Sequence, residues 1–126
     1  MKKIKLFTDS SLNPQEKIGY GAFLILKEKE ISFDDMKRNI KIKRFENTSS
    51  TKLELQTLLW ALKEIFDKNF IIEIYNDCQN IIGLENRKEK LEKNNFQTSS
   101  GKPLNNNELY KEFFEKLDEL NLTFIK

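Results

Sequence analysis

The sequence predicts a single α/β domain in which helices cover both faces of a mixed β-sheet. Apolar and polar residues alternate in segments 3–8 and 39–47, which is typical of half-buried strands. The period then changes to that of an amphipathic helix at 48–68, and an isoleucine-rich run follows at 70–76. The chain has 126 residues, of which 38% are hydrophobic and 33% are charged, so its composition suits one folded domain.

The first half of the chain predicts an antiparallel meander of three strands. Segment 3–8 is the first strand, and a turn follows at 12–17. Segment 18–27 is a long apolar strand whose two glycines predict a bulge or a close approach of another backbone. After a charged turn, segment 39–47 forms the third strand. The short connections favour antiparallel pairing of all three.

The second half predicts a crossover to a buried strand, followed by more helix and a last strand. The helix at 48–68 and the strand at 70–76 complete a strand–helix–strand unit, for which a right-handed crossover is expected. Segment 79–95 reads as a helix whose second half is charged. Another helix begins near Asn106, and residues 122–126 predict a fifth strand.

Composition excludes several classes of chemistry. The net charge is +2, from 22 basic and 20 acidic residues, which by itself does not indicate nucleic-acid binding. Because the chain has no histidine, it has no histidine general base and no histidine metal ligand. The single cysteine excludes an intramolecular disulfide and favours a cytoplasmic protein. No apolar run approaches the ~20 residues that a membrane span needs.

Three carboxylates lie where metal ligands would be expected. Asp9 and Asp77 each follow a predicted strand, and Glu54 lies in the predicted first turn of the helix between them. If the two strands are adjacent and parallel, these side chains meet at one edge of the sheet, and a divalent cation such as Mg²⁺ or Mn²⁺ would relieve their repulsion. Each also has a structural interpretation: Asp9 in a turn, Glu54 in a capping box with Thr51, and Asp77 as a helix N-cap.

Four segments resemble, in order, the motifs of one known family. FTDSS at 7–11 is similar to its first-strand motif, usually Thr-Asp-Gly-Ser, and TKLELQTLLWAL at 51–62 is similar to the helix that carries its catalytic glutamate. YNDCQNI at 75–81 is similar to its Thr-Asp-Ser-Gln motif, and GKPLNNNELY at 101–110 is similar to the segment before its late helix. The family is type 1 ribonuclease H, and the similarity spans nearly the whole chain.

This resemblance implies a fold and an activity. The expected sheet order is 3-2-1-4-5, and the expected reaction is metal-dependent endonucleolytic cleavage of the RNA strand of an RNA–DNA hybrid. Two Mg²⁺ ions per site are implied, with Mn²⁺ as the alternative. The implied catalytic and metal-binding residues are Asp9, Glu54 and Asp77. The implied substrate-binding residues are Asn13, Ser49, Ser50, Thr51 and Gln79.

The chain also departs from the family pattern. Ser10 replaces a glycine, and a serine is costly there if the backbone needs a positive φ. Cys78 replaces a serine and is interpreted as a small buried side chain, with a soft ligand that binds adventitious metals as the alternative. Residues 85–95 fall where many members carry a basic substrate-binding handle, but alternating charges also fit a solvated helix face.

The usual histidine loop and final helix do not follow the fifth strand, so we expect a domain over 1–126 that is truncated there. One sheet face would then be partly uncovered, which predicts a homo-oligomer, a missing C-terminal segment over that face, or reduced stability. Two alternatives to the nuclease stay open. One is a cleavage-deficient nucleic-acid-binding module of the same fold. The other is an interaction domain that docks through the uncovered sheet face.

Overall fold

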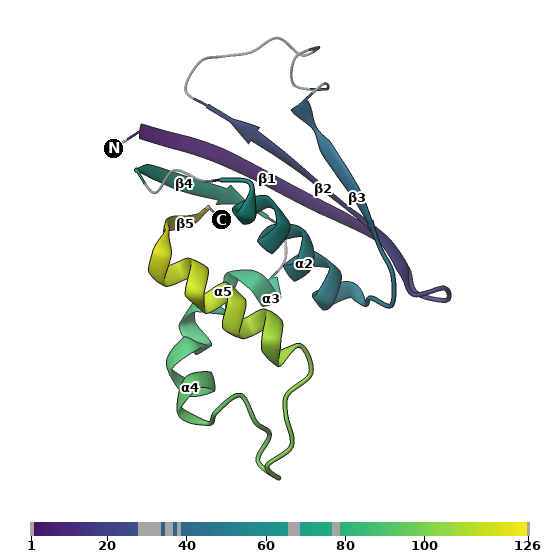
Figure 1. Cartoon of the computed structure of the whole chain (residues 1–126), viewed down its shortest axis with the longest axis vertical. Coiled ribbons are helices and arrows are strands. Elements are labelled where there is room, and N and C mark those ends of the chain that lie inside the picture. Colours follow the sequence, from purple (N-terminus) through teal and green to yellow (C-terminus); the bar gives the residue numbers. More distant parts are fainter. Residues whose placement is uncertain are drawn as a thin grey trace.

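The protein is built around a five-stranded mixed sheet with the strand order β3-β2-β1-β4-β5 (Figure 1). This computed structural model describes residues 2–27, 34, 37, 39–65, 69–76 and 79–125. The strands are β1 (Lys2–Asn13), β2 (Ile18–Leu26), β3 (Lys41–Phe45), β4 (Phe70–Tyr75) and β5 (Asn121–Ile125). The helices are α2 (Ser50–Lys63), α3 (Gln79–Ile82), α4 (Lys88–Lys93) and α5 (Asn107–Glu119), with the 3₁₀ helix η1 (Glu85–Arg87) before α4.

Strand pairing agrees with the predicted topology. The pairs β1–β2 and β2–β3 are antiparallel, as expected of a meander. The pairs β1–β4 and β4–β5 are parallel, as expected when a helix connects the strands. The predicted sheet order is therefore confirmed. The single helix expected at 79–95 is wrong, because the chain forms α3, η1 and α4 in succession, and Gly83, a weak helix former, lies at the first break.

One apolar cluster holds the sheet and the helices together. Ile4, Leu6, Ile72 and Ile74 are buried on one face of β1 and β4, and the leucines of α2 and the aromatic rings of α5 pack against them. The alternation of buried and exposed residues along β1 produces this face, as the period-two pattern predicts. Burying these side chains is the main favourable term in folding.

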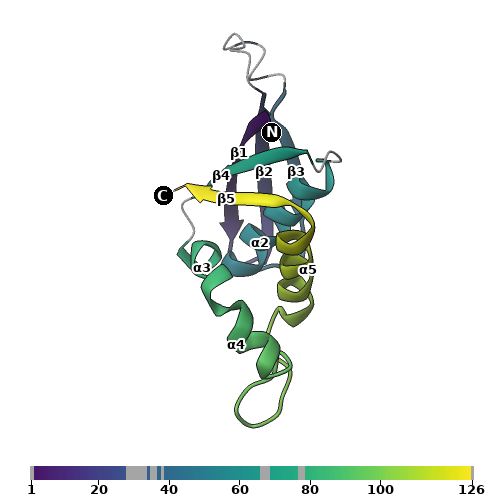
Figure 2. The same ribbon diagram turned by 90° about the vertical axis from the view of Figure 1, so that its left-hand side faces the viewer.

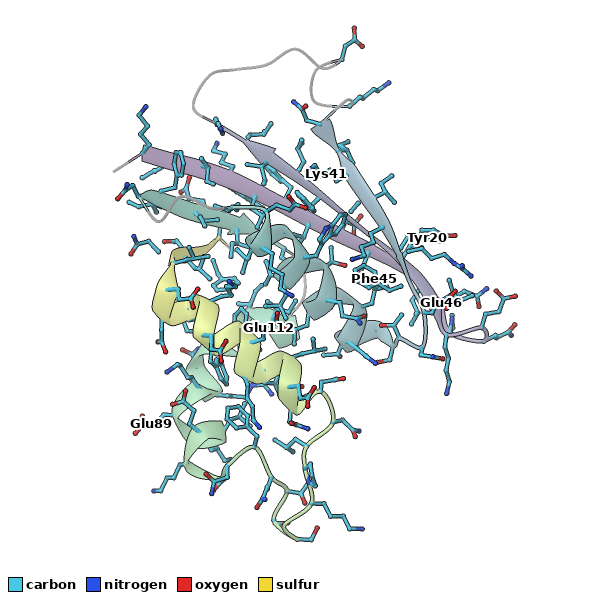
Figure 3. The ribbon with its side chains drawn as sticks, in the orientation of Figure 1. Tyr20, Lys41, Phe45, Glu46, Glu89 and Glu112 are labelled. Carbon is cyan, nitrogen blue, oxygen red and sulfur yellow. The ribbon has the colours of Figure 1, made fainter. Side chains whose placement is uncertain are left out.

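Helices were expected on both faces, but the four labelled helices all lie on one side of the sheet (Figures 1 and 2). The physical reason is that α2, α3 and α5 all contribute buried residues to the single apolar cluster on that face. On the opposite face, Tyr20 is 51% exposed and Ile42 is 68% exposed. Figure 3 shows Tyr20 at the β2–β3 end of the sheet, away from α4 and α5. None of the described helices is long and apolar enough to cross a membrane.

Candidate active site at the end of the parallel strands

Asp9 lies inside a strand rather than at its end. The sequence predicted that the first strand stops at residue 8, but β1 continues to Asn13 because its second half pairs with β2 in a long hairpin. The parallel pairing of β1 with β4 ends at Phe7 and Tyr75. Asp9 is thus two residues beyond the last parallel pair, at the edge where ligands bind in open α/β sheets, and its side chain is exposed.

The backbone around Asp9 is not strained by the serine that replaces the family glycine. Ser10 is extended in β1, and it is not among the non-glycine residues with positive φ. The N–H of Ser10 donates a hydrogen bond to Oδ1 of Asp9 at 2.9 Å. A glycine is therefore not required at this position, and the expected penalty for serine does not apply.

A hydrogen bond joins β1, at the residue before Asp9, to the residue that follows β4. Nδ2 of Asn76 donates to Oγ1 of Thr8. Thr8 directly precedes Asp9, and Asn76 directly precedes Asp77 in the sequence. Sequence reasoning missed this pair, although the repeated pattern of a polar residue before an aspartate at both strand ends was a visible signal.

Two of the predicted residues lie outside the described part of the chain, and a third is only partly described. Asp77 and Cys78 fall between the described residues 76 and 79, so the structure does not describe the third carboxylate or the thiol. Gln79 begins α3, but its side chain is not described.

Glu54 is half-buried on α2, and its position excludes the capping-box interpretation. The N-cap of α2 is Ser49, which makes no side-chain cap hydrogen bond, and the first turn contains no acidic residue. Glu54 is the fifth residue of the helix, so the expectation that it lies in the first turn is wrong. The physical reason is that the helix begins before Thr51, which moves Glu54 into the second turn and out of reach of the cap.

Two glycines of β2 allow α2 to approach the sheet closely. A Cβ atom at Gly19 would lie 2.4 Å from Cδ2 of Leu53, and one at Gly21 would lie 2.1 Å from Oγ1 of Thr57. Both distances are far below van der Waals contact, so larger residues would push the helix outward. The close approach is made by the side chains of α2 rather than by another backbone, and it fixes the segment of α2 that carries Glu54 against β2.

The predicted substrate-binding residues differ in their surroundings. Oδ1 of Asn13 accepts hydrogen bonds from the N–H groups of Gln15 at 3.2 Å and Glu16 at 3.3 Å, so this side chain shapes the β1–β2 turn. Ser49 and Ser50 are exposed before and at the start of α2.

Thr51, by contrast, lines a hollow of about 120 Å³ together with Arg87 and Tyr110. Arg87 and Tyr110 also line a second hollow of about 440 Å³, which lies toward the loop before α5. The two hollows are therefore neighbours, and they run from the start of α2 toward that loop. Sequence reasoning did not single out Tyr110 because its role depends on how α5 packs beside η1.

The charged segment at 85–95 combines a structural cation with cations on the surface. Nζ of Lys88 lies 3.0 Å from Glu92 and 3.6 Å from Asp118, so it ties α4 to α5. The hydrogen bond to Glu92 raises the pKa of Lys88, and the negative charge of Asp118 raises it further. Glu89 points away from α5 (Figure 3), as the solvated-face interpretation expects.

The donor chemistry of the predicted ligands fits a hard divalent cation. Asp9 and Glu54 supply carboxylate oxygens, the ligands that Mg²⁺ and Mn²⁺ prefer. Within the described ranges neither carboxylate forms an ion pair with a lysine or arginine. No group of three or more potential ligands is found among the described residues, a search that does not include Asp77.

Comparison with known proteins gives consistent results. The model of the RNase H family matches residues 1–126. A ribonuclease H of Clostridium botulinum is 32% identical over 130 residues, covering 100% of this chain and 83% of that protein. A ribonuclease H of Acetivibrio thermocellus is 30% identical over 118 residues, covering 89% of this chain and 72% of that protein.

Solved structures share the fold at lower identity. The structure of LC9-RNase H1, described as a type 1 RNase H with the type 2 active-site motif, matches with a TM-score of 0.74 and 16% identity over 98% of this chain and 61% of that one. A foamy viral protease-reverse transcriptase in complex with dsDNA matches with a TM-score of 0.70 and 11% identity over 99% of this chain and 81% of that one. From its family match and its relatives, this chain belongs to the RNase H family.

Proposed function

We propose that the chain is a metal-dependent endonuclease that hydrolyses the RNA strand of RNA–DNA hybrids. The observation that carries this proposal is the position of Asp9. It is an exposed carboxylate just beyond the last parallel pair of β1 and β4, on an RNase H fold. Membership of the RNase H family supports a nuclease that acts on such hybrids, and the dependence on metal is our inference from the carboxylate chemistry.

The chain's own residues have separate roles in this proposal. Asp9, Glu54 and Asp77 hold two Mg²⁺ ions, or Mn²⁺ in their place. Such ions, when bound, supply an activated water and a charge that stabilises the leaving oxygen. The hydrogen bond from Asn76 to Thr8 ties the residue that follows β4 to the residue of β1 that precedes Asp9. The glycine contacts of β2 hold the turn of α2 that carries Glu54.

Substrate recognition is proposed for the surface next to these carboxylates. Ser49, Ser50 and Thr51 lie at the start of α2, where exposed N–H groups and the helix dipole favour a phosphate. Asn13 and Gln79 complete the proposed set. Hydroxyl and amide groups of this kind distinguish RNA from DNA by contacting the 2′-hydroxyl and by fitting the shape of the duplex, rather than by reading the base sequence.

Cleavage of a hybrid that carries separate end labels on its RNA and DNA strands tests the proposal. We expect the 126-residue chain to cut the RNA strand internally in Mg²⁺ or Mn²⁺, and to leave the DNA strand intact. Chelation with EDTA should stop the reaction, and Asp9→Asn should abolish it while hybrid binding persists. Tight hybrid binding by the parent chain with no cutting in either metal would contradict the nuclease proposal and favour the cleavage-deficient binding module.

A further inference from the structure

The larger hollow is lined by residues from three segments of the chain. Arg87 and Leu91 come from the η1–α4 segment, Lys102, Pro103 and Leu104 come from the loop before α5, and Tyr110 comes from α5. The hollow's volume of about 440 Å³ lies within the ordinary range of pockets that hold small ligands.

The loop that carries Lys102, Pro103 and Leu104 is held by its own hydrogen bonds. Gln97 and Pro103 form an antiparallel bridge, and the N–H of Thr98 donates to the carbonyl of Lys102 at 2.7 Å. The N–H of Lys102 donates in turn to Oγ1 of Thr98 at 3.2 Å. At the base of the loop, the N–H of Leu104 donates to the carbonyl of Phe96 at 2.9 Å. Lys102 is therefore carried by an ordered turn beside the hollow.

The lining combines two kinds of chemistry that one ligand class would match. Arg87 and Lys102 are cationic, and none of the described lining residues is acidic, so the hollow favours an anion. Leu91, Pro103 and Leu104 add an apolar surface, and Tyr110 adds an aromatic ring. A planar aromatic base joined to a phosphate, as in a nucleotide, satisfies both parts.

A nucleotide inside a duplex does not satisfy both parts. The bases of a duplex are stacked on one another, so a protein surface meets mainly phosphate and sugar. An apolar and aromatic wall contributes to binding only when a base is unpaired and can leave the stack. The hollow also adjoins the smaller one, which contains Thr51 of the proposed substrate surface, through the shared residues Arg87 and Tyr110.

We infer that the larger hollow binds one unpaired nucleotide at the end of a strand of the hybrid. Its base would lie against Leu91, Leu104 and Tyr110, and its phosphate would lie near Arg87 and Lys102. This inference rests on the proposed function, because the adjoining surface is taken to hold the paired part of the hybrid. It predicts a preference for hybrids with a single-stranded extension over blunt ones.

The test compares two hybrids of equal paired length, one blunt and one with a three-nucleotide DNA overhang, by fluorescence anisotropy in EDTA. We expect the overhang to tighten binding by roughly fivefold in the parent chain, since one base contact and one phosphate contact are added. Lys102→Gln should remove that advantage without changing the affinity for the blunt hybrid. Lys93→Gln, the same change at an exposed lysine of α4 outside the hollow, should leave the advantage intact.

Equal affinity of the parent chain for the two hybrids would overturn the inference, and so would an overhang advantage that survives in Lys102→Gln. Binding of the blunt hybrid reports on the proposed function separately, so the two can fail independently.

Amide shifts of the parent chain locate the nucleotide without any substitution. A deoxynucleoside monophosphate and the overhang hybrid should both shift the amide signals of Leu91, Leu104 and Asn105, whereas inorganic phosphate at the same concentration should not. Unchanged signals with both nucleotide probes, or equal shifts with phosphate alone, would contradict the assignment of a nucleotide pocket.

Discussion

Replacing Gly21 with alanine should loosen the contact that places Glu54. The new Cβ would lie 2.1 Å from Oγ1, 2.9 Å from Cγ2 and 3.0 Å from Cβ of Thr57. Rotation of the threonine cannot relieve all three contacts, and its hydroxyl is held by a 2.8 Å hydrogen bond to the carbonyl of Leu53. The helix itself must therefore move away from β2.

The size of the effect follows from overpacking. Such insertions destabilise a core by about 1–3 kcal/mol, and the loss of glycine entropy in the unfolded chain offsets about 0.5–1 kcal/mol of that. At roughly 4 °C per kcal/mol for a chain of this size, Tm should fall by several degrees. Because a displacement of about 1 Å at a catalytic group can lower the rate by about 100-fold, hybrid cleavage should fall more steeply than stability.

Thermal unfolding and initial rates of hybrid cleavage, measured on the same samples, test this reasoning. Thr57→Ala in the Gly21→Ala background should recover part of both losses, which a double-mutant cycle would register as coupling. Gly101→Ala is the matched control, because a Cβ atom at this position meets nothing within 4 Å. Any effect of that substitution comes only from the φ of +84° that the alanine must adopt in a surface loop. Unchanged Tm and unchanged cleavage in Gly21→Ala would refute the proposed role of the close approach.

Four further predictions concern separate parts of the molecule. Glu54→Ala should abolish cleavage but change the free energy of unfolding by less than about 0.5 kcal/mol in a denaturant titration, since Glu54 caps nothing; a loss of about 1 kcal/mol would instead support a capping role. Thr8→Val and Asn76→Ala should each slow cleavage by a similar factor in single-turnover kinetics, with no further loss in the double variant; additive losses would argue against a shared hydrogen bond. Folding raises the pKa of Lys88, so the stability that Lys88 contributes is fully present below its pKa in the unfolded chain and is lost as pH rises through its higher pKa in the folded protein. Lys88→Met should therefore flatten the decline of Tm in strongly alkaline buffer. Parallel curves of Tm against pH for the two proteins would contradict this. Ile42→Ser should leave Tm unchanged if its sheet face is open to water, whereas a concentration-dependent sedimentation coefficient that the substitution abolishes would indicate a homo-oligomer through that face.

Much of the fold could be predicted because the spacing of hydrophobic residues changes where strands give way to helices. The alternation in β1 and β3 and the helical stripe of α2 are local patterns that report directly on burial. The two glycines of β2 predicted a bulge or a close approach of another backbone, and the side chains of α2 make the close approach instead. The strand order came from the family resemblance rather than from the pattern.

Other features depend on contacts that no local pattern contains. The polar run after Asp9 hides the second half of β1, which forms only because β2 pairs with it. The segment 79–95 lost its predicted continuity at Gly83, where the weak helix propensity of glycine favours a break between α3 and η1. The bond between Thr8 and Asn76 requires the parallel register of β1 and β4, and the hollow beside Tyr110 requires the packed loop before α5. Both features therefore depend on residues that are distant in the sequence.

The measurement that tests the central claim most directly is the rate of hybrid cleavage in Mg²⁺ by Asp9→Asn, Glu54→Gln and Asp77→Asn. Glu89→Gln, the same chemical change on the outward side of α4, is the matched control. We expect each of the three site variants to lose cleavage while it keeps the parental Tm and metal-free binding of the hybrid. The control should cut at the parental rate. Parental cleavage by any one of the three would contradict the assignment of this edge as the catalytic metal site.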